Sequence, residues 1–425
     1  MTSPELRRTI DAFWRMESPR LIASLTRMLR DVGLAEDMAQ EALVAALEHW
    51  PRDGVPDNPA AWLTTTARRR AIDRLRQRQL HHERQEALAY ELEQADMPAP
   101  DSDARLEDDI GDDLLRLLFI ACHPVLPTES RVALTLRLLG GLSTDEIARA
   151  FLQSEATIAQ RIVRAKRTLA KKQVAFEVPR RSELDERLDS VLEVIYLVFN
   201  EGYSATAGDD WMRPALCDEA LRLGRLLVGL MSNESEVSGL LALMELQASR
   251  AKARVDGQGN PVLLLEQNRA RWDHLQIARG LAALERAYCL GGAQQPYALQ
   301  ASIAACHARA RQAADTDWVH IAALYALLVK VMPSPVVELN RAVAQGMAYG
   351  PEAGLALLEA LADDPALRDY APLPAVRGDL LQKLGRHEEA RAAFECAASL
   401  TRNAREREVM LSRALACHWK PANNR

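Results

Sequence analysis

The length, composition and charge of the chain indicate a globular protein with more than one domain. Its 425 residues suffice for two or three domains, and 48% hydrophobic residues, 26% charged residues and a net charge of -6 are ordinary for a soluble chain. No apolar run approaches the roughly 20 residues that span a bilayer, and the N-terminal stretch lacks the apolar core of a signal peptide, which excludes membrane and secreted classes and favours a cytoplasmic protein.

The six cysteines are too scattered to suggest a disulfide framework or a zinc site. They contain no C-x-x-C pair. Three are followed by histidine, as in Cys122-His123, but adjacent residues of a helix point about 100° apart and make no ready chelate. We therefore predict reduced, mostly buried cysteines, with no metal and no cofactor.

The N-terminal part predicts two helices between Arg20 and Leu47, joined at the sequence RDVGLAED. The second is expected from Ala35 to Trp50, with carboxylates on one side. Its apolar side carries Met38, Ala42, Ala45 and Ala46. The segment HWPRDGVPDNP then holds three prolines and a glycine, so we expect a loop there.

A basic helix is predicted after this loop. Asn58 and Pro59 supply an N-cap and a first-turn proline. A core-facing stripe at steps of four comprises Leu63, Ala67, Ala71 and Leu75. The far side carries Trp62, Thr65, Arg69, Asp73 and Arg76. A tryptophan beside arginines can stack on an unpaired base while the cations hold the nucleic-acid backbone, but a core tryptophan beside a solvated basic face fits the spacing equally well.

The charge of the chain reverses after this helix. Residues 91–113, ELEQADMPAPDSDARLEDDIGDD, are acidic and include two prolines and few apolar side chains. Such composition predicts a flexible linker. Duplex DNA would repel this acidic linker, whereas a basic channel of a partner could bind it.

Two helices that meet at a tight corner are predicted between Ser143 and Lys172. Ser143 and Glu146 fit a capping box for the first helix, and Ser154 offers an N-cap for the second. Spacings of four, three and four predict a buried stripe of Ile158, Ile162, Ala165 and Leu169. The opposite side carries Ala156, Thr157, Gln160, Arg164, Arg167 and Lys171.

This corner has the pattern of a DNA-binding helix-turn-helix. In a major groove, glutamine can read adenine and arginine can read guanine, while lysine and arginine neutralise phosphate. The alternative is an amphipathic hairpin with a solvated basic face, because two-helix corners are common in helical proteins.

The rest of the chain, after a hinge-like VPRRSEL, is helical by its period. The segment GDLLQKLGRHEEARAAFECAASLTRNARE has residues in the order typical of a tetratricopeptide repeat (TPR). They are Leu384, Gly385, Ala390, Phe394 and Ala397. A weaker copy spans Asn340 to Pro365, with Gly350 at its corner. Stacked repeats usually present a concave surface to a protein or peptide ligand, and a purely structural appendage is the alternative.

Polar turns within this extension admit two interpretations. In VIYLVFNEGYSATAGDDWMRP, Asn200, Glu201, Tyr203 and Asp209 could form a binding loop, but helix capping and turn formation are favoured. The same holds for NRARWDHLQIARG and AADTDW. Since no catalytic triad, P-loop or H-E-x-x-H pattern accompanies them, we predict no enzymatic activity.

The order of three motifs is similar to that of the extracytoplasmic-function (ECF) sigma factors of bacterial RNA polymerase. The motifs are GLAEDMAQEALVAALEHW, NPAAWLTTTARRRAIDRLRQR and LGGLSTDEIARAFLQSEATIAQRIVRAKRTL, with the acidic linker before the third. The resemblance covers about residues 1–176, and the whole layout resembles the subgroup with a long TPR-like C-terminal extension. It implies RNA polymerase core and promoter DNA as partners.

The resemblance implies an all-α fold with two small sigma domains and a helical-repeat domain. Residues 1–80 would form region 2, 81–113 the acidic flexible linker, 114–176 the region 4 helix-turn-helix, and 182–425 the TPR-like extension. The residues expected against polymerase are Asp37, Gln40 and Glu41. Those expected at the minus-10 element are Asp57, Asn58, Trp62, Thr65, Arg69 and Arg76. Those expected at the minus-35 element are Thr157, Gln160, Arg161, Arg164, Arg167 and Lys171.

The predicted function is therefore promoter-specific initiation of transcription, with the extension regulating activity in cis. The alternative is a helix-turn-helix regulator or TPR scaffold that acts without core polymerase. The helix from Ala35 to Trp50 and the basic helix that carries Trp62 discriminate between the two, because a simple helix-turn-helix regulator has no use for either. The extension could activate or inhibit.

Overall fold

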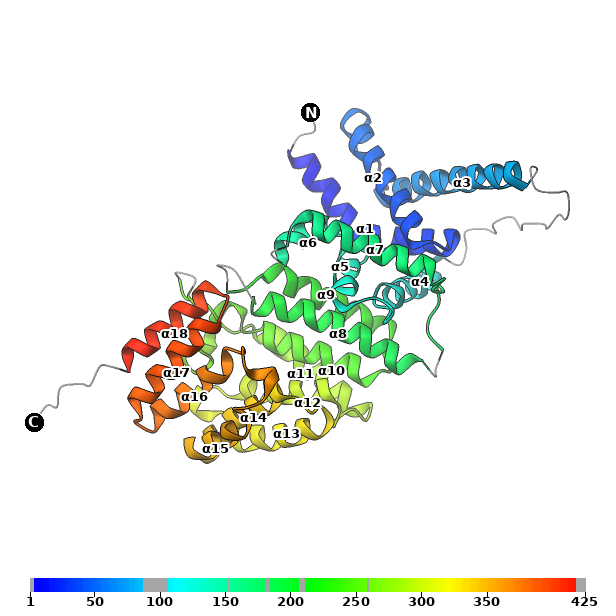
Figure 1. The fold of residues 1–425 in the computed structure, drawn as a ribbon. Coiled ribbons are helices and arrows are strands. Elements are labelled where there is room, and N and C mark those ends of the chain that lie inside the picture. Colours follow the sequence, from blue (N-terminus) through cyan, green and yellow to red (C-terminus); the bar gives the residue numbers. More distant parts are fainter. Residues whose placement is uncertain are drawn as a thin grey trace, which may run out of the picture. The chain divides into compact units, whose positions relative to one another are not determined.

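The computed structural model describes residues 4–86, 106–151, 153–180, 183–205, 211–257 and 260–417. Apart from short 3-10 turns and one isolated β-bridge between Val255 and Pro261, every regular element in these ranges is an α-helix (Figure 1). The all-α prediction is confirmed. The chain divides into two compact units, residues 1–195 and 196–425. No helix of the described part is long and apolar enough to cross a bilayer.

The first unit contains seven helices and the start of an eighth within the described ranges. They are α1 (Pro4–Leu29), α2 (Val32–Asp53), α3 (Pro59–Glu86), α4 (Leu106–Ala121), α5 (Thr128–Leu138), α6 (Thr144–Ala150), α7 (Glu155–Lys171) and α8 (Leu184–Tyr203). Helix α1 packs against α2, α3 and α4, and α7 packs against α5 and α6. Ile22, Ala42 and Leu63, one from each of the first three helices, are buried, and the apolar periods predict this for Ala42 and Leu63.

Helix α2 is longer than the sequence suggests. It begins at Val32, because Asp31 accepts a hydrogen bond from the Leu34 amide at 3.0 Å, and it passes through Pro51 to Asp53. A proline this late removes a single helical hydrogen bond, and the buried Trp50 anchors the last turn. Gly54 then ends the helix at φ 85°, a conformation open to glycine. The predicted loop is therefore shorter, and runs from Gly54 to Asn58.

Helices also extend into the predicted linker from both sides. Helix α3 continues to Glu86, and α4 begins at Leu106. Residues 87–105 lie outside the described residues, so the flexible linker stays a prediction. The hinge-like VPRRSEL lies partly outside them as well, and the boundary between the two compact units falls inside α8.

The second unit continues α8 with ten further described α-helices. They are α9 (Pro214–Leu230), α10 (Ser235–Ala248), α11 (His274–Cys289), α12 (Pro296–Arg309), α13 (Trp318–Val331), α14 (Pro335–Tyr349), α15 (Pro351–Leu361), α16 (Pro372–Lys383), α17 (His387–Leu400) and α18 (Ala404–Ala416). From α9 onward consecutive helices pack against each other, and α10 packs against both α11 and α12 (Figure 1).

The predicted repeat segment folds into a helical hairpin. Gly385 turns the chain between α16 and α17 at φ 73°, and Ala390, Phe394 and Ala397 are fully buried in one core. Gly350 likewise lies between α14 and α15. That these hairpins are tetratricopeptide repeats stays a prediction, as does a protein or peptide ligand of their surface.

Two smaller predictions can be compared with the structure. All six cysteines are free, and four of them are buried: Cys122, Cys217, Cys306 and Cys417. Asp273 caps α11 and Asp317 caps α13 through hydrogen bonds of 2.9 Å to the helix amides. The capping interpretation of these two turns is therefore confirmed.

Candidate nucleic-acid interface

The corner between α6 and α7 forms as the sequence predicts. The Ser143 hydroxyl accepts from the Glu146 amide at 3.1 Å, and the Glu146 carboxylate accepts from the Ser143 amide at 2.8 Å. Ser154 then caps α7 by accepting from the Thr157 amide at 3.1 Å. These local bonds satisfy helix amides that would otherwise lack partners.

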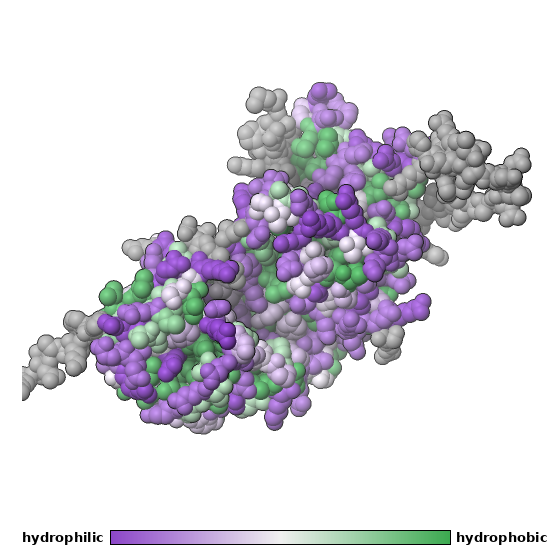
Figure 2. All heavy atoms as spheres, in the orientation of Figure 1, coloured by the Kyte–Doolittle hydropathy of each residue, from purple (hydrophilic) through white to green (hydrophobic). Residues whose placement is uncertain are grey.

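The two faces of α7 separate as predicted. Ile158, Ile162, Ala165 and Leu169 are the buried residues of this helix. Of the predicted minus-35 residues, Thr157, Gln160, Arg164, Arg167 and Lys171 are exposed and Arg161 is half-buried. Figure 2 shows hydrophilic side chains gathered over α7. The helix therefore offers a polar and cationic face while its apolar stripe holds it to the unit.

A groove runs beside this face. It has a volume of about 450 Å³ and lies between the start of α5 and α7. Thr157, Gln160, Arg161 and Arg164 line one side, and Glu129 is its only acidic residue among those described. The structure thus brings four of the six predicted minus-35 residues to one concave surface.

The predicted minus-10 residues lie at the start of α3 and along it. The Asn58 side chain accepts from the Ala61 amide at 3.0 Å, so Asn58 is the N-cap of α3. Asp57, Asn58, Thr65, Arg69 and Arg76 are exposed. Asp73, also exposed, lies 3.9 Å from Arg76.

Trp62 is neither fully buried nor fully exposed. Its side chain is half-buried. Its ring meets that of the buried Trp50 edge-on, with centroids 5.6 Å apart, and lies 6.4 Å from the His49 ring. Tertiary packing therefore holds part of the indole against α2, and the remainder is exposed, so stacking on a base stays a prediction.

The predicted polymerase-facing residues share one region of α2. Asp37 and Glu41 are exposed, and Gln40 is half-buried. The Glu41 carboxylate accepts from Arg70 of α3 at 3.0 Å, a link between α2 and α3 that the sequence analysis missed. Exposed pairs of this kind contribute little to stability, so Glu41 can exchange this partner for another at small cost.

A buried ion cluster that sequence reasoning missed connects α2 to α5 and α7. Glu36 is only 3% exposed, accepts from Arg137 Nε at 2.6 Å and pairs with Lys166. Burial alone would raise the pKa of Glu36, but the charges of Lys166 and Arg137 and their hydrogen bonds hold it below its ordinary value. In the sequence, only the position of Glu36 beside the apolar Ala35 indicated that this carboxylate is buried. The other acidic residues within this helix are exposed.

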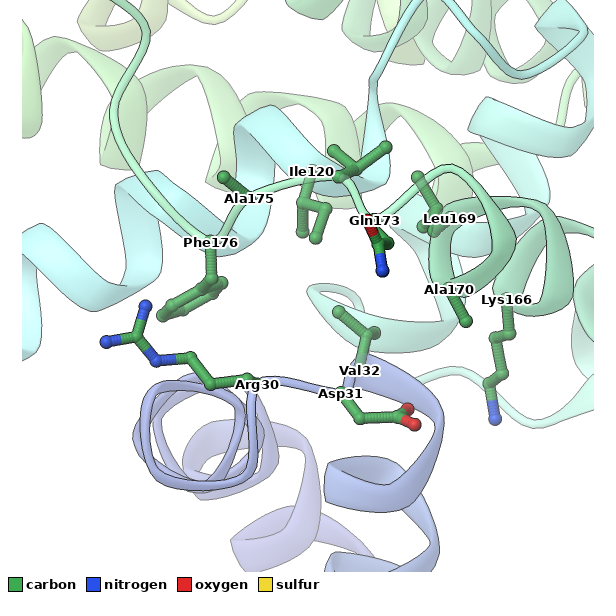
Figure 3. Close-up of a pocket in the computed structure, with 11 residues that line it drawn as sticks. Arg30, Asp31, Val32, Ile120, Lys166, Leu169, Ala170, Gln173, Ala175 and Phe176 are labelled. Carbon is green, nitrogen blue, oxygen red and sulfur yellow. The ribbon is translucent and has the colours of Figure 1, made fainter. Parts of the chain in front are cut away.

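Further contacts support the same packing. Asp113 of α4, 2% exposed, pairs with Arg27 at 3.3 Å and with Arg116 at 2.7 Å, and Arg15 pairs with Glu146. A cavity of about 390 Å³ lies between the α1–α2 corner and the end of α7. Figure 3 shows Lys166 and Phe176 among the residues that line it. In this structure the two predicted DNA-facing helical groups therefore form one packed unit.

Comparison with known proteins shows that each of the two helical groups matches a protein family. The family described as Sigma-70 region 2 matches residues 13–81, and that described as Sigma-70, region 4 matches residues 116–169. Residues 187–288 match a family of unknown function, DUF6596. No solved structure matches.

One relative matches nearly the whole chain, and others match its N-terminal part. An uncharacterized protein of Rhizobium meliloti (strain 1021) is 45% identical over 91% of both chains. The ECF RNA polymerase sigma factor SigK of Mycobacterium tuberculosis (strain ATCC 25618 / H37Rv) is 32% identical over 37% of this chain and 81% of its own. SigK of Mycobacterium ulcerans (strain Agy99) is 30% identical over the same shares.

Proposed function

This chain belongs to the ECF RNA polymerase sigma factor family, and from that premise we propose that it binds core RNA polymerase and directs it to promoters. The observation that carries the proposal is the outward face of α7. Gln160, Arg161 and Arg164 line a groove, while a buried stripe and the Ser154 cap hold the helix in place. Glutamine and arginine at a helix surface can read bases in a major groove.

We assign the other proposed roles by the helix on which the residues lie. We propose that Asp37, Gln40 and Glu41 of α2 contact core polymerase. The residues proposed for the minus-10 element are Asp57, Asn58, Trp62, Thr65, Arg69 and Arg76, and those for the minus-35 element are Thr157, Gln160, Arg161, Arg164, Arg167 and Lys171. Run-off transcription with purified core polymerase and this protein as the only specificity factor tests the proposal. Absence of any specific transcript, with DNA binding intact, would favour a regulator that acts without polymerase.

Replacing Trp62 with alanine is expected to impair promoter opening more than promoter binding. An unpaired base can stack on the accessible part of the indole only after the strands separate, and such stacking contributes about 1–3 kcal/mol per base. Permanganate reactivity of the minus-10 thymines should therefore fall several-fold, while closed-complex affinity changes little.

Two matched variants separate this role from folding. Trp62→Phe keeps an aromatic ring against Trp50, and Asn58→Ser keeps an N-cap for α3 while removing the amide. Trp62→Phe should recover part of the opening, and Asn58→Ser should reduce it without unfolding α3. Wild-type thymine reactivity in both Trp62→Ala and Asn58→Ser would contradict the assignment.

We further propose that the helical extension regulates transcription in cis and that activity requires it. A covalently joined domain of this size is held at high effective concentration near the DNA-facing helices and polymerase, so even weak contacts matter. If the chain ends at Ile195, we expect the yield of run-off transcript to fall by about tenfold or more.

The end point of this truncation follows from the structure. The first half of α8 belongs to the first unit: Arg187 donates to the Phe119 carbonyl at 2.8 Å, and Arg131 donates to Glu193 at 3.0 Å. Ending the chain at Ile195 keeps these bonds. Ending it near Glu177 would remove them, so a loss of activity could then come from destabilising the first unit instead of from losing regulation. Equal transcript yield from the full chain and the truncated one would refute a regulatory extension, and a higher yield would show inhibition.

A further inference from the structure

A cavity of about 460 Å³ lies among α8, α10, α12, α13 and α14, wholly within the second unit. This volume is in the range of small-molecule sites. Its polar lining includes Asn200, Gln247, Arg250, Gln300, His307 and Asn340. The remaining walls are largely apolar, with residues such as Leu243 and Ile303, and no described lining residue is aspartate or glutamate. The cavity therefore combines one cation with neutral polar groups and an apolar interior.

Two arginines beside this cavity, Arg250 and Arg254, have no carboxylate partner among the described residues. Arg250 donates to the Tyr203 hydroxyl, and its guanidinium lies 5.8 Å from the ring centroids of Tyr203 and Trp272. Arg254, 7% exposed, lies 3.4 Å from the Tyr203 ring centroid, and its Nη1 has no hydrogen-bond partner. Aromatic faces stabilise these cations in part, but they do not neutralise them.

A third arginine, Arg269, adds positive charge near the cavity. Arg269 donates to the backbone carbonyls of His307 and Ala310, at 2.5 and 2.8 Å, and to the Thr316 hydroxyl at 3.3 Å. None of these acceptors carries a formal charge. Arg269 also interacts with the charge of Asp315, so the arginines beside the cavity without a described counterion are Arg250 and Arg254. A buried cation such as Arg254 is normally paired.

A histidine adds a neutral polar group to the wall of the cavity. His307 lines the cavity and is 9% exposed, and its Nδ1 has no hydrogen-bond partner. Burial and the charges of Arg250 and Arg269 lower the pKa of His307 to about 4, so the ring is neutral at physiological pH. Such a ring offers a hydrogen bond to a ligand without adding charge.

We propose that this cavity binds a small organic carboxylate. Arg250 supplies the charge partner, since a guanidinium matches a carboxylate with two parallel hydrogen bonds. His307 and the amide of Gln247, one turn before Arg250, offer polar contacts, and the apolar walls take the carbon skeleton. This ligand site is a property of the second unit and does not depend on the proposed function in transcription.

The test uses the full-length protein and the probe pair phenylacetate and phenylacetamide, which share size and shape but differ in charge. Calorimetric titration at millimolar concentrations is expected to show saturable binding of phenylacetate and none of the amide. Arg250→Gln should weaken phenylacetate binding by about tenfold or more, the usual range for a hydrogen bond to a charged group. Arg279→Gln, an exposed arginine of α11, is the matched control and should bind as the wild type does.

A second variant guards against misfolding of Arg250→Gln. Asn340 is an exposed cavity residue, and Asn340→Asp adds a negative charge at constant size, so it should also weaken phenylacetate binding. The proposal is overturned if phenylacetate does not bind, if the amide binds equally well, or if Asn340→Asp leaves the affinity unchanged. Binding of inorganic phosphate in preference to phenylacetate, with the same dependence on Arg250, would overturn the carboxylate class.

Discussion

Replacing Glu36 with glutamine is expected to destabilise the packing of α2 against α5 and α7 by about 3–5 kcal/mol, the usual cost of breaking a buried ion pair. Glutamine has the same size, so no cavity arises. The loss is electrostatic, because Arg137 and Lys166 are mostly buried, with side chains 18% exposed, and both would lack a counter-charge. Hydrogen exchange of the full chain should show faster exchange in peptides from α2 and α7.

The same cluster predicts a dependence on pH. The pKa of Glu36 is lower in the folded chain than its ordinary value, so the cluster contributes its full stability above the ordinary pKa of a carboxyl group. This contribution is lost as the pH falls through the lowered value. Protection of α2 and α7 should therefore decrease at acidic pH in the wild type, and less so in Glu36→Gln.

The matched control is Glu48→Gln, an exposed glutamate of the same helix. It removes the same charge from α2 without touching Arg137 or Lys166, and it should leave exchange unchanged. Equal protection in Glu36→Gln and Glu48→Gln would show that the ion cluster does not hold these helices together.

Replacing Gln160 and Arg164 together with alanine is expected to lower promoter affinity by about 30-fold or more. A good contact from glutamine or arginine to a base contributes about 1–3 kcal/mol, and two such losses at the lower limit give that factor. Both residues face the groove beside α7, away from its buried stripe, so folding should be preserved. Binding of holoenzyme to a promoter first identified with the wild-type protein measures the effect.

Arg149→Ala is the control for this pair. Arg149 is an exposed arginine of α6 that pairs with Asp145 on its own helix at 2.8 Å, so its removal changes the charge by the same amount as Arg164→Ala. It should leave promoter affinity largely intact. If the double variant binds the promoter as tightly as Arg149→Ala does, this face of α7 does not read DNA.

Local chemistry made much of the architecture of the candidate DNA-binding helices predictable. The capping box of Ser143 and Glu146, the Ser154 cap and the Asn58 cap all join residues three apart, and the stripe from Ile158 to Leu169 follows the helical period. Interactions at such short range depend on neighbouring residues alone, so the sequence by itself determined where these helices begin and which face of α7 is buried.

Only the tertiary structure decided what meets each helix face. The helical period does not say that Glu36 lies against Arg137 and Lys166, or that Trp50 covers part of Trp62. The arginines around the cavity of the second unit likewise come from separate segments: Arg269 from a turn that the sequence analysis assigned to capping, and Arg250 and Arg254 from a segment for which it made no prediction. Contacts between residues far apart in the chain depend on how whole helices pack, and a buried charge acquires its partner only when that packing brings the two side chains together.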